Sequence, residues 1–361
     1  MNVLIKLFNK FFASKKTYME KEIFEQSDII FELIRKYIKK DYTVNIELPE
    51  NIRKISLIAS GSSYHSAAIA ANFLRTKAHY DAQSYYASEV SLCENFDVDS
   101  DTLYIFISQS GETSDTLKSL NKIKQNTDKT LAVTNTKNSS IYNNSKYKIL
   151  TYAGIEKAIA STKSMSAQMY CLFLISVKLM QKKELPVKSI LDELLSLPEY
   201  LRNAFSKREE IQKYSSVLVN YENAAILASG MFYPLAKEGA LKIKETSYIN
   251  TTAYPTGEFL HGHIAILNKK CAVIVLVNNI NVQFTIDVLN KIENNYKTDA
   301  LIISAVPLYE IKDENKINIF TSSDIEFMFS SLVILQLLSF ESARLLNRNA
   351  DLPEGLTKIV K

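Results

Sequence analysis

Two stretches of this chain are copies of one another, and this internal repeat limits the folds that the chain can adopt. The stretches are IASGSSYHSA at residues 58–67 and LASGMFYPLA at residues 227–236. Identical residues stand 169 positions apart at Ala59/Ala228, Ser60/Ser229, Gly61/Gly230, Tyr64/Tyr233 and Ala67/Ala236. In both copies an apolar run ends in Ser-Gly and leads into a helical pattern, which is where an open parallel sheet places its ligand crevice. The repeat therefore favours two similar halves over a single large barrel.

Each half contains strand-like runs that alternate with amphipathic helical segments. The runs lie at residues 55–60, 102–108 and 130–135 in the first half, and at 224–230, 271–279, 299–306 and 317–320 in the second. This alternation is typical of parallel α/β units, so we expect an α/β fold in which each half is a three-layer α/β/α sandwich. The expected division is a helical N-terminal segment at 1–45, a first domain at 46–185, a helical linker at 186–215 and a second domain with a C-terminal tail at 216–361.

Composition excludes several classes of protein. The 361 residues carry a net charge of only +4, which is too weak a field to predict a nucleic-acid surface. The three cysteines, Cys93, Cys171 and Cys271, are far apart and form no metal-ligand spacing, so we expect a reduced, cytoplasmic chain without a metal or another cofactor. The longest apolar runs, at 169–180 and 328–340, are too short to span a bilayer.

The first sixteen residues, MNVLIKLFNKFFASKK, combine apolar side chains with four lysines. The lysines interrupt the apolar run, so the segment lacks the apolar core and the cleavage site of a signal peptide. We predict a basic amphipathic helix, which packs against the body of the protein, remains in solvent or lies on a membrane surface. We expect one of the first two arrangements and no contact with a membrane.

A hydroxyl-rich loop follows the strand predicted at 102–108. It consists of Ser108, Gln109, Ser110, Gly111, Glu112 and Thr113. Backbone N–H groups at a helix start, together with three hydroxyls, can hold a phosphate dianion, with Gly111 allowing the turn and Thr113 placed to cap the helix. A plain N-cap rich in Ser and Thr has the same composition. Ser62 and Ser63, at the end of another predicted strand, favour the phosphate site because adjacent strand ends converge on one crevice. Residues 277–285 of the second half lack this run of hydroxyls, so one anion site is expected.

Three motifs in order, ASGSSYHSA (59–67), ISQSGETSDTL (107–117) and GIEKAIASTKS (154–164), resemble the sugar isomerase (SIS) domain. The duplication resembles proteins with two such domains in tandem. The resemblance continues through residues 238–267 and the tail at 351–361, and residues 17–26 are similar to the segment that enters the isomerase part of glucosamine-6-phosphate synthases. It covers nearly the whole chain from Thr17 to Lys361 and implies two tandem SIS domains.

The resemblance implies a site that draws residues from both halves. It assigns phosphate binding to Ser63, Ser108, Gln109, Ser110 and Thr113, beside Ser62, and it places Ser161 near the sugar. It assigns the base that moves a proton between C1 and C2 to Glu245, beside Lys242, the ring-opening acid/base to His261, and an imine-forming amine to Lys358. In relatives this histidine reaches into the neighbouring subunit's site, which implies a homodimer with shared sites. The chain departs from the family at His263, where proline is usual, and over residues 353–357.

The same residues imply an enzyme acting on a sugar phosphate. The first expectation is an isomerase/deaminase that converts glucosamine 6-phosphate into fructose 6-phosphate and ammonia. The alternative is a deglycase acting on a fructosamine 6-phosphate such as fructoselysine 6-phosphate; both reactions need one carboxylate and one ring-opening acid/base. A non-catalytic sugar-phosphate sensor would need the phosphate loop alone. Asn2 stands where a glutamine-hydrolysing domain requires a cysteine nucleophile, so we expect no glutamine hydrolysis by this chain.

Overall fold

The computed structural model describes residues 17–267, 270–280, 282–296, 298, 300–309 and 316–358. The helix predicted within the first sixteen residues lies outside this part of the chain. The described chain begins with two helices, α2 (Tyr18–Phe24) and α3 (Gln26–Tyr37), which precede the first sheet. Thr17 caps α2 by accepting a hydrogen bond from the backbone N–H of Glu20.

The first half alternates strands and helices. Its elements are β1 (Lys54–Ala59), α4 (Gly61–Thr76), β2 (Asp81–Tyr86), α5 (Ala87–Leu92), β3 (Thr102–Ser108), α6 (Ser114–Lys124), β4 (Thr130–Thr134), α7 (Ser140–Asn144), β5 (Tyr147–Leu150) and α8 (Lys163–Lys182). Two helices, α9 (Lys188–Ser206) and α10 (Arg208–Leu218), then lead to the second half.

The second half repeats the pattern. Its elements are β6 (Asn223–Ala228), the 3₁₀ turn η1 (Gly230–Phe232), α11 (Tyr233–Ser247), β7 (Asn250–Pro255), the turns η2 (Glu258–Leu260) and η3 (His263–Ile266), β8 (Cys271–Val277), α12 (Val282–Tyr296), β9 (Ala300–Ser304), β10 (Lys316–Asn318) and α13 (Asp324–Leu345).

Each half contains a five-stranded sheet whose described strands all pair in parallel. The strand orders are β2-β1-β3-β4-β5 and β10-β9-β8-β6-β7. The predicted α/β class with two parallel sheets is thereby confirmed. In each sheet successive strands are added first on one side of the first strand and then on the other. The order therefore switches direction between β1 and β3 in the first sheet and between β6 and β8 in the second. Such a reversal opens a crevice at the carboxyl ends of the strands.

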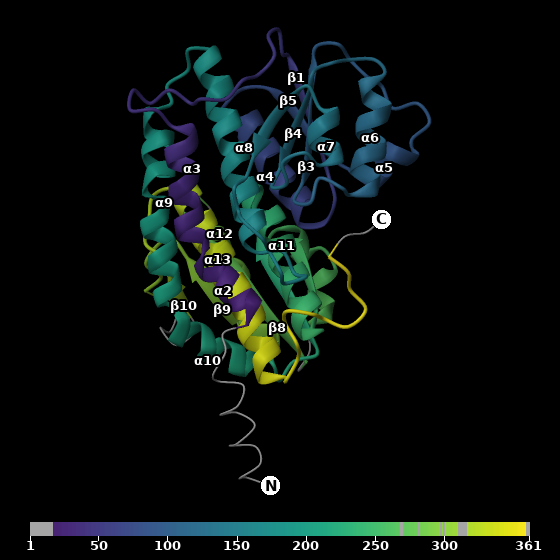
Figure 1. The fold of residues 1–361 in the computed structure, drawn as a ribbon. Coiled ribbons are helices and arrows are strands. Elements are labelled where there is room, and N and C mark those ends of the chain that lie inside the picture. Colours follow the sequence, from purple (N-terminus) through teal and green to yellow (C-terminus); the bar gives the residue numbers. More distant parts are fainter. Residues whose placement is uncertain are drawn as a thin grey trace.

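The two sheets face one shared layer of helices (Figure 1). Alternate residues of β1 point to opposite faces: Ile55 and Leu57 join a core that extends across both halves, whereas Ile58 joins a separate core under α5, α6 and α7. In β6, Ile226 joins the same shared core and Leu227 joins a third core beneath α12. Helices α4, α8, α11 and α13 therefore lie between the sheets, and the outer helices complete each sandwich.

Helix α13 is long and apolar enough to cross a membrane by length and composition, but its apolar window is fully buried inside the protein. It packs against α9, α10 and α11. Its apolar surface is therefore accounted for by the core between the two halves.

The duplicated Ser-Gly turns have the same backbone conformation. Ser60 and Ser229 are extended, with φ of −130° and −120°. Gly61 and Gly230 follow with φ of +56° and +58°, a left-handed conformation that favours glycine. The sequence repeat is thus a repeat of structure, with each turn at the carboxyl end of the first strand of its sheet.

Candidate active site

The hydroxyl-rich loop connects β3 to α6. Ser108 Oγ lies 2.9 Å from Thr113 Oγ1, and the backbone N–H of Gly111 donates to Ser108 Oγ at 3.0 Å. The N–H of Glu112 donates to Ser110 Oγ at 3.1 Å. The loop therefore closes on itself through its own hydroxyls, and these are the donors and acceptors that a phosphate oxygen would exchange with.

Thr113 occupies the N-cap position of α6, but its side chain makes no capping hydrogen bond to the helix. The hydroxyl is instead turned toward Ser108. A plain Ser/Thr-rich cap would direct this hydroxyl at the first-turn N–H groups. The geometry thus favours an anion loop over a simple cap.

Ser62 and Ser63 lie in the first turn of α4, directly after β1. Because β1 pairs with β3 and Ala59 aligns with Ile107, these serines and the loop at Ser108 leave adjacent strand ends. Both serines are half-buried, as are Gln109 and Ser110. The structure therefore places Ser62, Ser63 and the hydroxyl-rich loop along one edge of the sheet, as the sequence predicts.

A row of charged side chains lies on the face of α11 that meets α4. Lys242 Nζ is 2.5 Å from Glu245 Oε2 and 3.5 Å from Glu238 Oε1. Glu238 Oε2 is in turn 2.7 Å from Nδ1 of His65, on the second turn of α4. The row His65, Glu238, Lys242 and Glu245 thus joins the helix of the phosphate side to the helix that carries the candidate base.

Burial and charge act in opposite directions within this row. Burial opposes ionisation of Glu238, yet Lys242 and His65 hold the pKa of this carboxyl below its ordinary value. Burial likewise favours neutral Lys242, but Glu238 and Glu245 keep the pKa of the amine above its ordinary value. Glu245 is the most exposed of the three on α11, with 21% of its side chain exposed, so its carboxylate is the one that can reach a substrate.

Lys358 lies in a second charged cluster, at the start of α8. Its Nζ donates to Glu156 Oε2 at 2.7 Å and to the carbonyl of Ala158 at 2.6 Å. Glu156 is fully buried; burial opposes its ionisation, but Lys358 and hydrogen bonds from Ser164 and Thr162 hold the pKa of the carboxyl below its ordinary value. Ser161 is held by a 2.7 Å hydrogen bond to Ser164.

The two charged clusters act on one another. The charge of Glu156 contributes to the raised pKa of Lys242, after the larger effects of burial, Glu238 and Glu245. Glu156 and its partner Lys358 therefore lie within electrostatic range of Lys242 on α11, although their positions in the sequence are far apart.

His261 is a predicted site residue that the structure does not bring to either charged cluster. It follows η2, is exposed, and forms no side-chain hydrogen bond or ion pair within the described part of the chain. The next residue, Gly262, has φ of +100°, which makes a sharp turn. His263, the departure from the family pattern, packs against the ring of Tyr254 with centroids 4.6 Å apart.

Sequence reasoning did not single out His65, Glu156 and Glu238. Glu238 had a signal, because residues 238, 242 and 245 share one face of a helix. His65 follows the two candidate serines and Glu156 precedes Ser161, but their partners lie 173 and 202 residues away in the chain. No local pattern predicts such pairs.

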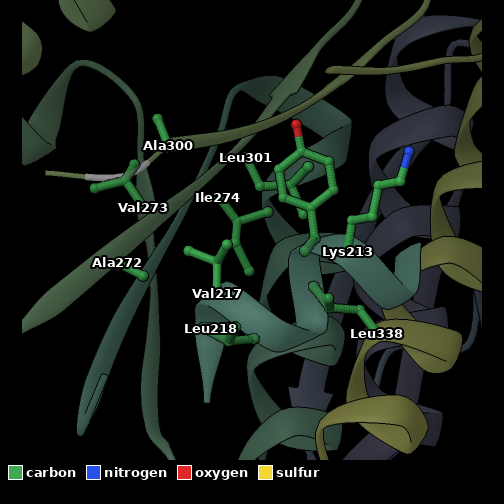
Figure 2. A pocket seen from close by; sticks show the side chains of 10 residues that line it. Lys213, Val217, Leu218, Ala272, Val273, Ile274, Ala300, Leu301 and Leu338 are labelled. Carbon is green, nitrogen blue, oxygen red and sulfur yellow. The ribbon is translucent and has the colours of Figure 1, made fainter. Parts of the chain in front are cut away.

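Two cavities lie away from these clusters. The one in Figure 2, of about 90 Å³, is lined by α10, α13 and the first residues of β8 and β9, and is aliphatic apart from Lys213 and Tyr214. It therefore opens at the opposite end of the second sheet from the crevice. The other, of about 370 Å³, lies at the crevice of the second half, where Met231 and Asp324 meet Phe73 and Lys77 of the first.

Comparison with known proteins places these features in context. The SIS domain model matches residues 50–177 and 218–345. The isomerizing glutamine–fructose-6-phosphate aminotransferase of Campylobacter jejuni is 34% identical over 364 residues, which cover 98% of this chain and 60% of that protein. The Legionella pneumophila protein of the same name is 36% identical over 270 residues, 73% of this chain and 44% of its own length. The chain thus spans at most about 60% of the length of these relatives.

Solved structures give the same result for the fold. The C-terminal domain of glucosamine-fructose-6-phosphate aminotransferase from Francisella tularensis superposes with a TM-score of 0.88 at 29% identity, covering 94% of this chain and 99% of that one. A glucosamine-6-phosphate deaminase from Thermotoga maritima superposes with a TM-score of 0.77 at 19% identity, covering 95% and 99%, which shows a shared fold.

Proposed function

Since this chain belongs to the SIS-domain family and carries two such domains, we propose that it is a phosphosugar isomerase/deaminase that interconverts glucosamine 6-phosphate and water with fructose 6-phosphate and ammonia. The observation that carries the proposal is the contact between His65 and Glu238, which links the helix starting at Ser62 and Ser63 to the helix bearing Lys242 and Glu245. A substrate whose phosphate occupies the hydroxyl-rich loop then presents its other end to the charged row.

The phosphate serves as the anchor. Hydrogen bonds from Ser108, Ser110, Thr113 and the N-terminus of α6 fix a group that does not react, and this binding energy orients C1 and C2 against the base. The names of the relatives, which join an aminotransferase to an isomerizing activity on fructose 6-phosphate, support an amino-sugar phosphate as the substrate class.

Proton transfer is the central step. After His261 assists opening of the sugar ring, Glu245 removes the proton from C2 and returns it to C1, while O1 gains a proton that the C2 ammonium group gives up. The aldehyde carbon thereby becomes an alcohol and C2 becomes an iminium carbon. Water adds to C2 and ammonia leaves, which gives the ketose. Lys242, held charged between two carboxylates, stabilises the negative charge that develops on oxygen during the proton shift.

A substrate panel tests the proposal. The chain is incubated with glucosamine, galactosamine and fructoselysine 6-phosphates, and the released ammonia, lysine and hexose 6-phosphate are measured; fructose 6-phosphate with an ammonium salt tests the reverse direction. We expect ammonia and fructose 6-phosphate from glucosamine 6-phosphate. Lysine and glucose 6-phosphate from fructoselysine 6-phosphate alone would instead establish the deglycase, and binding without turnover of any substrate would establish a sensor.

A further inference from the structure

The short helix α2 places the carboxylate of Glu22 beneath the segment that leads into α8. The backbone N–H groups of Lys157 and Ala158 both donate to this carboxylate, the second at 3.3 Å. Glu22 is only 3% exposed. A side chain from the beginning of the described chain therefore holds backbone next to the second charged cluster, 135 residues away.

The same short stretch is held from its other side. Lys358 donates to the carbonyl of Ala158 and to the carboxylate of Glu156. Asp351, at the start of the tail, accepts from the backbone N–H of Ile159 and, with its carboxylate, from the first N–H groups of α2. Residues 156–159 are thus fixed between α2 and the C-terminal tail.

The Glu22 carboxylate is unfavourable for the fold. Burial, reinforced by the nearby charge of Glu156, raises the pKa of Glu22 to about 7, although the two backbone N–H groups act to lower it. A raised pKa in the folded state means that the ionised form weakens the fold, so stability falls as pH rises from the ordinary value near 4.5 toward 7. A side chain that costs stability at neutral pH is expected to be kept for function.

We propose that Glu22 is a positioning residue, whose carboxylate holds residues 156–158 and so keeps Glu156 where it orients Lys358 toward the substrate. The inference rests on the proposed function for its effect on turnover, but the holding of the segment can be measured by itself. Glu22 touches no candidate substrate-binding side chain directly and acts through the backbone of Lys157 and Ala158.

Among the residues that the structure describes, no lysine or arginine forms an ion pair with the Glu22 carboxylate. The charges that act on Glu22 are those of Glu156 in the segment and Lys163 on α8. The surrounding elements carry further charged groups: Glu20 on α2, Glu25 just after it, Lys157, Arg208 on α10, Glu341 on α13, and Asp351 and Lys358 in the tail. Lys163 pairs with Glu25, Lys358 with Glu156, and Arg208 with both Glu20 and Glu341. The charge of Glu22 is therefore compensated chiefly by the two backbone N–H groups.

Glu22→Gln tests the proposal. The amide keeps the length of the side chain but turns a donor toward one of the two N–H groups, so one hydrogen bond is lost. We expect kcat at pH 8 to fall at least about ten-fold with little change in KM, because the phosphate loop is untouched. We also expect wild-type kcat to rise as pH increases through about 7, and the variant to lack this rise. The melting temperature at pH 8 should stay the same or increase.

Two further variants make the result specific. Glu22→Asp keeps the charge but withdraws it by one methylene, so kcat should fall while the rise with pH persists. Glu20→Gln is the matched control: it lies on the same helix and pairs with Arg208, away from the segment, and its pH profile should follow that of the wild type.

Amide hydrogen exchange measures how firmly Glu22 holds residues 156–158, and this measurement needs no substrate. In the Glu22→Gln protein the N–H groups of Lys157 and Ala158 should exchange at least about ten-fold faster than in the wild type at pH 8, while the core of α13 is unchanged. If the wild type turns over no sugar phosphate, the proposed function fails and the exchange result still decides whether Glu22 holds the segment. Unchanged exchange, or changed exchange with an unaltered kcat and pH profile in an active enzyme, would overturn the role assigned to Glu22.

Discussion

Lys242 is the residue on which the charges of the candidate site converge. Its side chain is 1% exposed and lies between the carboxylates of Glu238 and Glu245. A buried ammonium group is tolerated only when it is paired, and here two carboxylates share it. The pair also fixes the orientation of the Glu245 carboxylate, which leaves its second oxygen to act on the substrate.

Glu245→Gln separates the base from its surroundings. The change keeps the size of the side chain and a hydrogen bond to Lys242 but removes the basic oxygen, so kcat should fall by about 10²–10⁴, or roughly 2.7–5.5 kcal/mol of barrier. Substrate should still bind, since the phosphate loop lies in the other half. In deuterated water the wild type should incorporate label at C1 of the ketose and the variant should not. Normal turnover with label in the variant would leave Glu245 as an ordinary helix residue.

Ser110→Ala tests the hydroxyl-rich loop. It removes one hydrogen bond to a charged phosphate, on the order of 1.5–3 kcal/mol, so KM should rise by about ten-fold or more while kcat changes less. Ser114→Ala, on the first turn of α6 and outside the assigned set, is the matched control. Competitive inhibition by inorganic phosphate reports on the same site. If Ser110→Ala and Thr113→Ala both left KM and phosphate inhibition unchanged, the phosphate would have to bind elsewhere.

Residue identity alone was enough to predict where the hydroxyls gather, because Ser62, Ser63 and the loop at Ser108 each follow a strand. It was not enough for the charged partners. The bond between His65 and Glu238 and the bond between Lys358 and Glu156 depend on how the halves pack and on where the tail runs, and neither is encoded in a local spacing. The roles of these residues in turnover stay predictions that the variants above can test.

At the scale of elements, the β3–α6 connection depends on one glycine. Gly111 has φ of +68°, and a Cβ atom there would lie 2.0 Å from Ser139 Oγ and 2.9 Å from Thr134 Oγ1. The backbone carbonyl of Gly111 also accepts from the N–H of Ile141, at the start of α7. The loop is therefore packed against α7 and has little freedom to adjust.

Gly111→Ala should disrupt this connection. A left-handed conformation costs an alanine about 1–2 kcal/mol, and the collision with Ser139 adds to it. Gly230→Ala is the matched control, since Gly230 has φ of +58° but nothing within 4 Å of the added Cβ. Chemical denaturation should show a loss near 1–2 kcal/mol for Gly230→Ala and a clearly larger loss, with loss of phosphate binding, for Gly111→Ala. Equal losses of unfolding free energy in the two variants would mean that the loop shifts enough to accommodate the added methyl group.

The elements themselves were largely predictable. Buried parallel strands form continuous apolar runs: β3, β4, β8 and β9 each fall within a predicted run, and β1 and β6 begin one residue before theirs. The edge strands β2, β5 and β7 were missed because their sequences, DAQSYY, YKIL and NTTAYP, are short or polar and partly exposed. Edge strands have one neighbour and one open face, so the apolar signal that marks a central strand is weak in them.

At the scale of the whole molecule, the exposed position of His261 supports a site completed by a second subunit. The proposed homodimer can be tested by mixing the inactive Glu245→Gln and His261→Ala chains. If His261 acts on the partner's site, random pairing gives mixed dimers with one intact site, about a quarter of all sites. Activity near this fraction is the expected outcome. Mixed dimers that form, as shown by differently tagged chains, but remain inactive would place His261 in its own subunit's site.

The matching Ser-Gly turns on either side of the shared helices are what duplication of a single half would produce. An ancestral single half that paired with its twin across this layer would have possessed two equivalent crevices. Once the two were fused into one gene, only one crevice had to keep its chemistry, and the other was free to drift. In the present chain, the offset of 169 positions aligns Met231 with Ser62 and Phe73 with Lys242, so the second crevice carries a thioether and a ring where the first carries a hydroxyl and an amine.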